Sequence, residues 1–89
     1  MFQLIFMAFY TYILQSEKDG TFYIGSSADP EERLLKHNRP HSGYTARKQP
    51  WKLVWQEIHE DKSNAIKREK FLKKQKSRAY LEELISKSK

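Results

Sequence analysis

Aromatic and β-branched residues gather in three short runs along the chain, and each run has the composition of a β-strand. Residues 9–14 read FYTYIL, residues 21–25 read TFYIG, and residues 51–58 read WKLVWQEI, in which apolar and polar positions alternate. The first two runs are separated by SEKDG at 16–20, where Asp-Gly predicts a hairpin turn. The pattern therefore predicts three strands, and the first two form a hairpin.

The first predicted helix spans residues 28–38, and its start signal is complete. Asp29 stands at the N-cap, Pro30 at the first helical position, and Glu32 three residues after the cap. The segment 39–50 that follows, RPHSGYTARKQP, is polar and bounded by prolines, so it predicts a long loop.

Two further helices are predicted after the third strand. One runs from about Ser63 to Lys74, and the other from Ser77, its N-cap, to Ile85. The order ββαβαα predicts an α+β fold with one small three-stranded antiparallel sheet flanked by helices. The length and the absence of repeats indicate a single domain over residues 1–89.

The composition limits the classes of protein to which the chain can belong. It has no cysteine, which excludes disulfides and thiolate metal sites and fits a reducing compartment. The apolar start MFQLIFM is too short for a membrane span and lacks the features of a signal peptide. We therefore expect a cytoplasmic protein with no membrane association, in which residues 1–6 are an extension before Met7 or a lead-in to the first strand.

Positive charge is concentrated in the second half of the chain. Residues 1–44 carry four basic and five acidic side chains, whereas residues 45–89 carry thirteen basic and six acidic ones. This asymmetry fits a polyanionic partner such as nucleic acid, and it fits a solvated lysine-rich surface equally well.

Arg33 and His37 are four residues apart in the first predicted helix, so they share one of its faces. A guanidinium beside an imidazole suits a phosphate, because the first can clamp two oxygens and the second can transfer a proton. Taken alone, however, Arg33 and His37 are more simply explained as solvent-facing side chains, with Arg33 paired to Asp29.

Glu69 falls on the apolar face of the second predicted helix. At 100° per residue, it lies within the arc marked by Ala65, Ile66 and Leu72, while Lys67, Lys70 and Lys74 lie on the outer face. A carboxylate turned inward is costly unless it is paired or binds a cation. Glu69 is therefore either the partner of an arginine such as Arg33 or a ligand of a hard divalent ion such as Mg²⁺ or Mn²⁺.

Tyrosines and one glycine mark the predicted hairpin. Tyr12 and Tyr23 can approach each other on one face of the two strands, where phenols beside a phosphate can move a proton. Each tyrosine taken alone is better explained as a core or half-buried residue whose hydroxyl has one partner. Gly25 is expected to end the second strand and to leave its backbone clear for a ligand.

Aromatic and basic residues also interleave along the predicted loop and the second helix. This composition suits stacking on bases together with neutralisation of phosphates, although Trp51 is better explained as a core anchor. The residues predicted to contact nucleic acid are Gly25, Ser26, Lys36, Tyr44, Arg47, Lys48, Arg68 and Lys73.

Taken in order, these residues resemble the GIY-YIG nuclease superfamily, in particular its small single-domain bacterial members, over roughly residues 8–80. The matching segments are Tyr23 to Ser26, Asp29-Pro30, Arg33 to Asn38, Tyr44-Thr45, Pro50-Trp51 and Arg68-Glu69-Lys70. The chain departs from the family in its first motif, where Tyr10-Thr11-Tyr12 replaces Gly-Ile-Tyr and Tyr12 takes the place of the family's tyrosine.

The resemblance implies hydrolysis of phosphodiester bonds in DNA, with a role in repair or recombination. It implies that Tyr12 is the general base or part of it, with Tyr23 as its hydrogen-bonding partner. Arg33 would stabilise charge on the phosphoryl oxygens, and His37 would assist proton transfer or substrate placement. Glu69 would hold a single Mg²⁺ or Mn²⁺.

Two alternatives to an independent nuclease stay open from the sequence. The chain is also consistent with a nucleic-acid-binding module that does not cut, and with a subunit that works only with a protein partner, for which residues 2–6 are a candidate contact. Branched and flap DNA are among the substrates that we expect on the nuclease interpretation.

Overall fold

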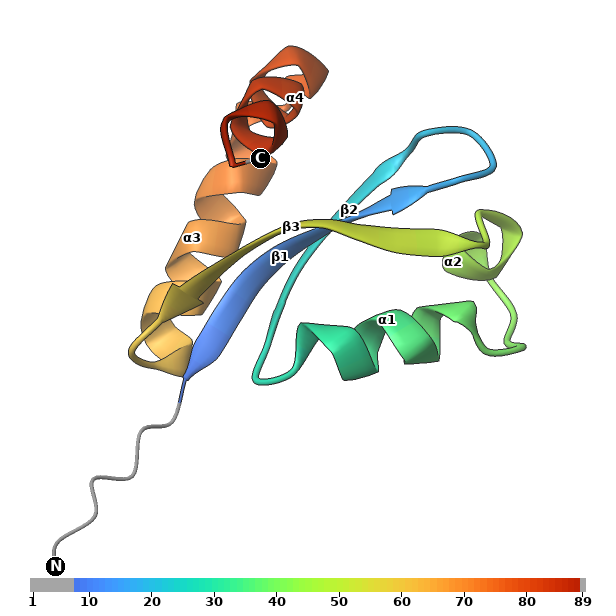
Figure 1. The fold of residues 1–89 in the computed structure, drawn as a ribbon, viewed down its shortest axis with the longest axis horizontal. Helices are drawn as coiled ribbons and strands as arrows, with labels where there is room; N and C mark the ends of the chain where they lie inside the picture. The colour runs from blue at the N-terminus through green and yellow to red at the C-terminus, as the bar shows by residue number, and fades with distance from the viewer. Residues whose placement is uncertain (1–7, 89) are drawn as a thin grey trace, which may run out of the picture.

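The first strand is a nearly continuous apolar run, a composition typical of a strand covered on both faces. In the computed structural model, which describes residues 8–88, this run forms β1 (Phe9–Ser16), and its residues 11–14 are all buried. β1 pairs with both β2 (Phe22–Ser27) and β3 (Trp51–His59) in an antiparallel sheet of order β2-β1-β3 (Figure 1). The predicted α+β class and three-stranded antiparallel sheet are confirmed.

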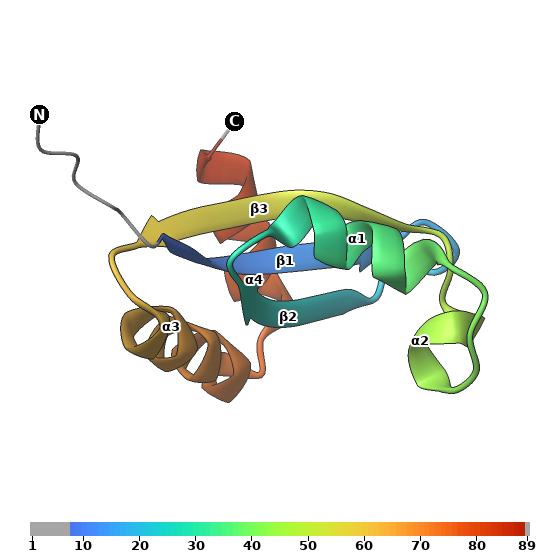
Figure 2. The ribbon, with the colours of Figure 1, turned by 90° about the horizontal axis from the view of Figure 1, so that it is seen from below.

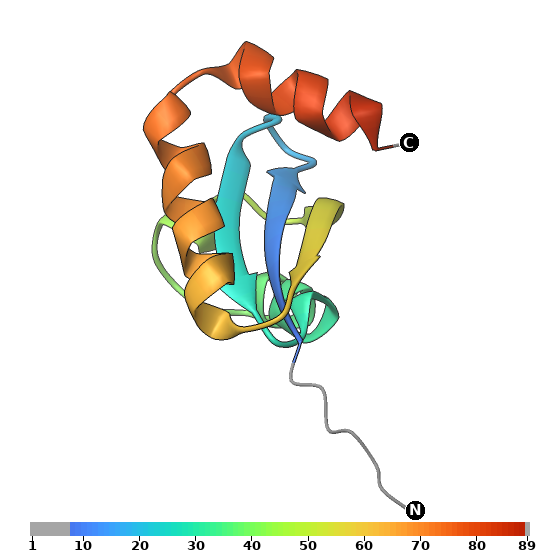
Figure 3. The same cartoon turned by 90° about the vertical axis from the view of Figure 1, so that its left-hand side faces the viewer.

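Helices cover both faces of this sheet. α1 (Pro30–Asn38) lies on one face, and α3 (Lys62–Gln75) and α4 (Arg78–Lys87) lie on the other. Figure 2 shows α1 in front of the sheet and α4 behind it. Figure 3 shows α3 alongside β2, and α4 turning across the end of the sheet that carries the β1–β2 hairpin. The sheet therefore separates two cores.

Each core takes alternate residues of β1, because successive side chains of a strand point to opposite faces. The core under α1 contains Tyr12, Leu14 and Trp51. The core under α3 and α4 contains Ile13, Trp55, Leu72 and Leu81. Trp51 is thus a core anchor, as the sequence predicted.

A β-bulge in β3 divides the two tryptophans between these cores. Ile13 pairs with Trp55 and Leu14 pairs with Leu53, so Val54 is an extra residue with no partner on β1. Strict alternation over 51–58 would place both tryptophans, four residues apart, on the same face. The predicted alternation is wrong at this point, because the extra residue reverses the facing of everything after it.

Side-chain caps set the helix starts. Asp29 Oδ1 accepts from the backbone N–H of Glu32 at 3.1 Å, and Ser77 Oγ accepts from that of Tyr80 at 3.2 Å, as predicted for both helices. α3 begins at Lys62 rather than Ser63 because Asp61 is its N-cap.

The segment 39–50 is not wholly a loop, since it contains one short helix, α2 (Tyr44–Arg47). Gly43 precedes this short helix with a φ of 102°, a backbone conformation that residues with a Cβ rarely adopt. The indole N–H of Trp51 donates to the Thr45 carbonyl at 2.9 Å and holds the turn against the core. The prediction of an entirely irregular segment is therefore wrong over these four residues.

None of the helices formed by residues 8–88 is both long enough and apolar enough to span a membrane. Residues 1–6, for which an extension or a partner contact was predicted, lie outside the described part of the chain.

Candidate active site

Tyr12 is the most deeply buried of the predicted site residues. Its side chain is 1% exposed and faces α1, and its backbone pairs with Gly25 on β2. An added Cβ at Gly25 would lie 2.6 Å from the Tyr12 hydroxyl oxygen and 3.2 Å from a ring carbon of Tyr23. The space beside Gly25 is thus filled by the two tyrosines. The expectation that this glycine ends the strand and clears its backbone for a ligand is wrong, because β2 continues to Ser27.

Tyr12 and Tyr23 do lie on one face of the hairpin, but as diagonal neighbours rather than a directly opposed pair. Tyr12 pairs with Gly25 and Tyr23 pairs with Leu14, two positions along β1. Tyr23 also contacts His37 of α1, with the two ring centroids 4.6 Å apart in an edge-to-face arrangement. The strand hairpin and α1 therefore meet at these aromatic rings.

The hydrogen bond of His37 fixes its tautomer. Its Nδ1 lies 2.9 Å from the backbone carbonyl of Arg33, and a carbonyl oxygen only accepts, so Nδ1 carries a proton. In the neutral ring Nε2 is then the acceptor. His37 is thereby prepared to take a proton at Nε2.

Arg33 lies one helical turn before His37 and is half-buried. Its guanidinium is near enough to the Tyr12 hydroxyl to lower the pKa of that group. Its Nε is buried and has no hydrogen-bond partner among residues 8–88. A buried donor with no partner costs free energy in the folded chain unless a ligand accepts from it.

Burial is the largest influence on the Tyr12 hydroxyl, and it raises the pKa of this group. Arg33 lowers this pKa, while nearby Tyr23 and Glu69 raise it together with burial. The Tyr12 phenol is therefore protonated at neutral pH.

Glu69 faces inward from α3, as the helical periodicity predicted, and its side chain is 19% exposed. It accepts a hydrogen bond from Ser26 Oγ at 2.6 Å across the β2 edge and another from Lys73 Nζ at 2.6 Å. Its partners are therefore Ser26 and Lys73 rather than Arg33. Since Tyr23, Arg33 and Glu69 all act on the pKa of Tyr12, these four predicted catalytic side chains share one electrostatic neighbourhood. His37 joins them through its ring contact with Tyr23.

Glu69 is an isolated carboxylate. The described residues contain no cluster of three or more His, Cys, Asp or Glu side chains that could hold a metal ion together. A single carboxylate suits Mg²⁺ or Mn²⁺, which keep several waters and take oxygens from a substrate phosphate. Glu69, with Ser26 orienting one oxygen, fits such an ion once Lys73 turns away.

The residues predicted to contact nucleic acid fall into two groups. Tyr44 and Arg47 of α2 are exposed, and Lys36 is exposed with a 3.7 Å ion pair to Glu32. In contrast, Lys48 forms an ion pair with Asp19 of the hairpin and lies over the Tyr44 ring. The contact with Lys48 holds the pKa of Asp19 well below its usual range.

Arg68 belongs to the second group. Its Nε donates to Glu57 at 3.0 Å, and its guanidinium lies over the rings of Trp55 and Phe71 at 5.8 and 5.5 Å. These contacts join α3 to β3. They occupy the positive charge of Arg68, which was predicted to contact nucleic acid.

His41 and Thr45, which were not among the predicted site residues, complete a hollow of about 170 Å³ beside Arg33, Lys36 and His37. His41 Nε2 lies 2.9 Å from the Thr45 hydroxyl. Helical spacing could not reveal His41, because α1 ends at Asn38 and Pro40 follows.

Comparison with known proteins shows the family of this chain. Residues 8–82 match the GIY-YIG catalytic domain, a span that contains every predicted site residue. The chain belongs to the GIY-YIG family. Within this GIY-YIG domain, the first motif reads Tyr10-Thr11-Tyr12 and the second reads Tyr23-Ile24-Gly25.

Relatives of this GIY-YIG protein are bacterial. A UPF0213 protein of Staphylococcus saprophyticus is 44% identical over 61 residues, which cover 67% of this chain and 73% of the relative. A UPF0213 protein of Staphylococcus aureus is 43% identical over the same shares. The solution NMR structure of a UPF0213 protein from Bacillus halodurans is 30% identical, with a TM-score of 0.54 over 90% of this chain and 84% of the other.

Proposed function

We propose that this GIY-YIG protein is a metal-dependent endonuclease that hydrolyses phosphodiester bonds in DNA. The observation that carries the proposal is the meeting of five side chains from β1, β2, α1 and α3: Tyr12, Tyr23, Arg33, His37 and Glu69. Phosphoryl chemistry needs fixed positive charge, a positioned nucleophile and a place for a cation. Each need has a candidate in this set.

Arg33 is the candidate that binds the scissile phosphate. Its partnerless buried Nε is a donor in a site of reduced solvent access, where a hydrogen bond to charge is stronger than in water. As negative charge grows on the phosphoryl oxygens, this guanidinium stabilises it.

Two residues compete for the role of general base. The raised pKa of Tyr12 keeps its proton at neutral pH, so its phenol suits donation to an oxygen of the substrate. His37, with its proton fixed on Nδ1, accepts at Nε2 and suits removal of a proton from the attacking water. We therefore assign the base to His37, with Tyr23 fixing the orientation of its ring.

Glu69 is the candidate metal ligand. A divalent ion bound there would supply positive charge to offset the charge on the leaving 3′ oxygen. Ser26 holds one carboxylate oxygen of Glu69. The side chain of Lys73, which contacts the other oxygen, is exposed and can move away to leave that oxygen to the ion.

Cleavage assays on labelled DNA test this proposal. Duplex, single-stranded, flap and branched DNA are incubated with Mg²⁺, Mn²⁺ or EDTA, and Glu69→Gln is compared with Glu83→Gln, a matched change on the exposed face of α4. We expect cutting only with a metal, a loss of about 100-fold or more in Glu69→Gln, and none in Glu83→Gln. Full activity in Glu69→Gln would contradict the assignment.

A second candidate function is nucleic-acid binding without cleavage, which the excess of basic side chains over residues 45–89 favours. Salt-sensitive binding with no cutting in either metal would support it.

A nuclease of this kind would act on bacterial DNA in the cytoplasm, and the preferred substrate in the assay would indicate a repair or recombination role.

A further inference from the structure

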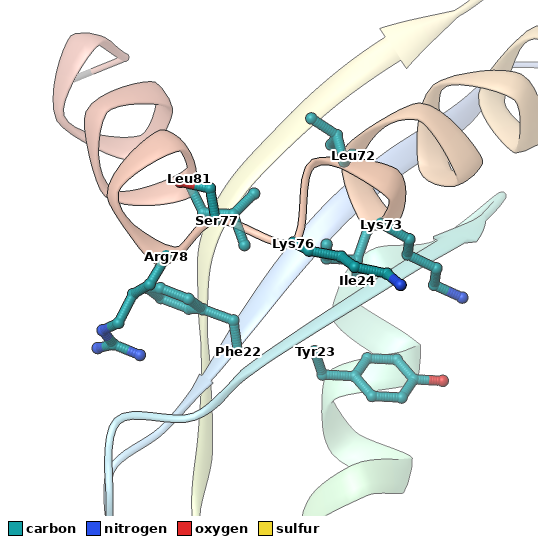
Figure 4. A pocket seen from close by; sticks show the side chains of 9 residues that line it. All are labelled: Phe22, Tyr23, Ile24, Leu72, Lys73, Lys76, Ser77, Arg78 and Leu81. Carbon is teal, nitrogen blue, oxygen red and sulfur yellow. The ribbon is translucent and has the colours of Figure 1, made fainter.

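The elbow between α3 and α4 forms a hollow against β2, which we call the elbow pocket. Its volume is about 430 Å³, within the range of small-ligand sites (Figure 4). The residues that line it include Phe22, Ile24, Leu72, Lys73, Lys76 and Arg78. Tyr23 also lines it, whereas Tyr12, Arg33, His37 and Glu69 do not.

Its floor is apolar and its rim is cationic. Phe22 and Ile24 of β2 are half-buried, and Leu72 of α3 is fully buried beneath them. Lys73, Lys76 and Arg78 add three positive charges around this floor. A nucleotide has the complementary chemistry, because the aromatic faces of its base can stack on the apolar floor and its phosphate can pair with the cationic rim.

Arg78 presents a fixed plane at one end of the pocket. Its guanidinium lies 4.5 Å from the centre of the Phe22 ring. Its Nε donates to Glu82 at 3.0 Å and another nitrogen donates to the Gly20 carbonyl at 2.9 Å. A guanidinium held by these three contacts offers a surface on which a nucleic-acid base can stack.

Lys76 stands at the other end and has an unusual backbone. Its φ of 45° and ψ of 37° are left-handed, a conformation that favours glycine at the end of a helix. In Figure 4 the side chains of Lys73 and Lys76 extend to the same side as the Tyr23 hydroxyl. Lys73 also contacts Glu69, so the pocket adjoins the candidate active site.

We propose that the elbow pocket holds an unpaired base of the nucleic-acid substrate, next to the phosphate that is cut, while Lys76 and Lys73 bind the phosphates that lead to it. The proposal rests on the proposed function and deepens it, because it names a substrate with a single-stranded segment beside the cleavage point. A paired base is excluded from such a pocket, since its two faces are stacked within the duplex.

The experiment measures binding rather than cleavage. Fluorescence anisotropy in EDTA compares a blunt duplex with the same duplex bearing a short single-stranded overhang, across a range of salt concentrations. Lys76→Gly removes the charge while suiting the left-handed backbone, so the fold is retained. Lys74→Ala removes an equal charge from the exposed face of α3. Phe22→Leu keeps an apolar floor and removes the ring.

We expect the wild type to bind the overhang more tightly than the blunt duplex. Lys76→Gly should weaken overhang binding roughly threefold or more and lower its salt slope by about one, leaving blunt-duplex binding unchanged. Phe22→Leu should weaken overhang binding about fivefold to a hundredfold. Lys74→Ala should retain the preference for the overhang.

The pocket assignment is overturned if the wild type binds both DNAs alike, or if Lys76→Gly and Lys74→Ala behave alike. The same is true if Phe22→Leu binds the overhang as tightly as the wild type does. A protein that cuts DNA but gives any of these results keeps the proposed function and loses the pocket. A protein that cuts nothing, yet loses its overhang preference in Lys76→Gly, keeps the pocket and loses the nuclease.

Discussion

Replacing Gly25 by alanine should destabilise the domain through one contact. The added Cβ would lie 2.6 Å from the Tyr12 hydroxyl oxygen and 2.8 Å from Cζ, both well inside normal van der Waals distances. Tyr12 is 1% exposed, so its ring has no space into which it can move. The backbone at Gly25 is not left-handed, and the cost is therefore steric rather than conformational.

Overpacking of this kind costs about 1–3 kcal/mol. In a domain of this size about 1 kcal/mol lowers Tm by roughly 4–8 °C, so thermal unfolding followed by circular dichroism should show a fall of about 5–20 °C. Gly43→Ala is the control, because a Cβ there meets nothing within 4 Å and the cost comes only from its positive φ.

A double-mutant cycle isolates the contact. Tyr12→Phe removes the oxygen that lies closest to the added methyl group, so Gly25→Ala should cost less in that background, by about 0.5 kcal/mol or more. Equal costs in the two backgrounds, or a Gly25→Ala variant as stable as the wild type, would refute the reasoning.

Two further predictions concern stability. The pKa of Tyr12 is raised in the folded state, so its contribution to stability is complete below the unfolded value near 10 and is lost as pH rises through the folded value. The urea midpoint should therefore fall further between pH 8 and pH 11 in the wild type than in Tyr12→Phe. Equal falls in the two proteins would contradict the role of burial. Arg68→Ala should cost about 1–2 kcal/mol in urea unfolding, because it loses the Glu57 ion pair and two ring contacts, whereas the exposed Lys67→Ala should change stability by less than about 0.5 kcal/mol.

Features encoded by local chemistry could be predicted from the sequence. The caps at Asp29 and Ser77 depend on side chains that bond a backbone group three residues away, so the sequence contains both partners. The inward position of Glu69 follows from helical periodicity alone. The resemblance to the GIY-YIG superfamily is confirmed as well, because residues 8–82 match the GIY-YIG catalytic domain.

Features that depend on distant partners could not be predicted. Arg68 and Lys48 were predicted to be available to nucleic acid, but each is paired in the fold. Arg68 pairs with Glu57, 11 positions away, and Lys48 pairs with Asp19, 29 positions away, and these partners come together only when the sheet forms. The bulge at Val54 has no signal in the sequence, because it exists only as a mismatch between two paired strands.

The bulge also gives the molecule two independent optical reporters. The chain has two tryptophans, and the extra residue between them places one indole in each core. Trp51 lies 6.1 Å from the rings of both Tyr23 and His37, so its emission should respond to events at the candidate active site. Trp55 lies under α3 and α4, on the side of the elbow pocket, and single-tryptophan variants would allow each face to be followed separately as the protein unfolds or binds DNA.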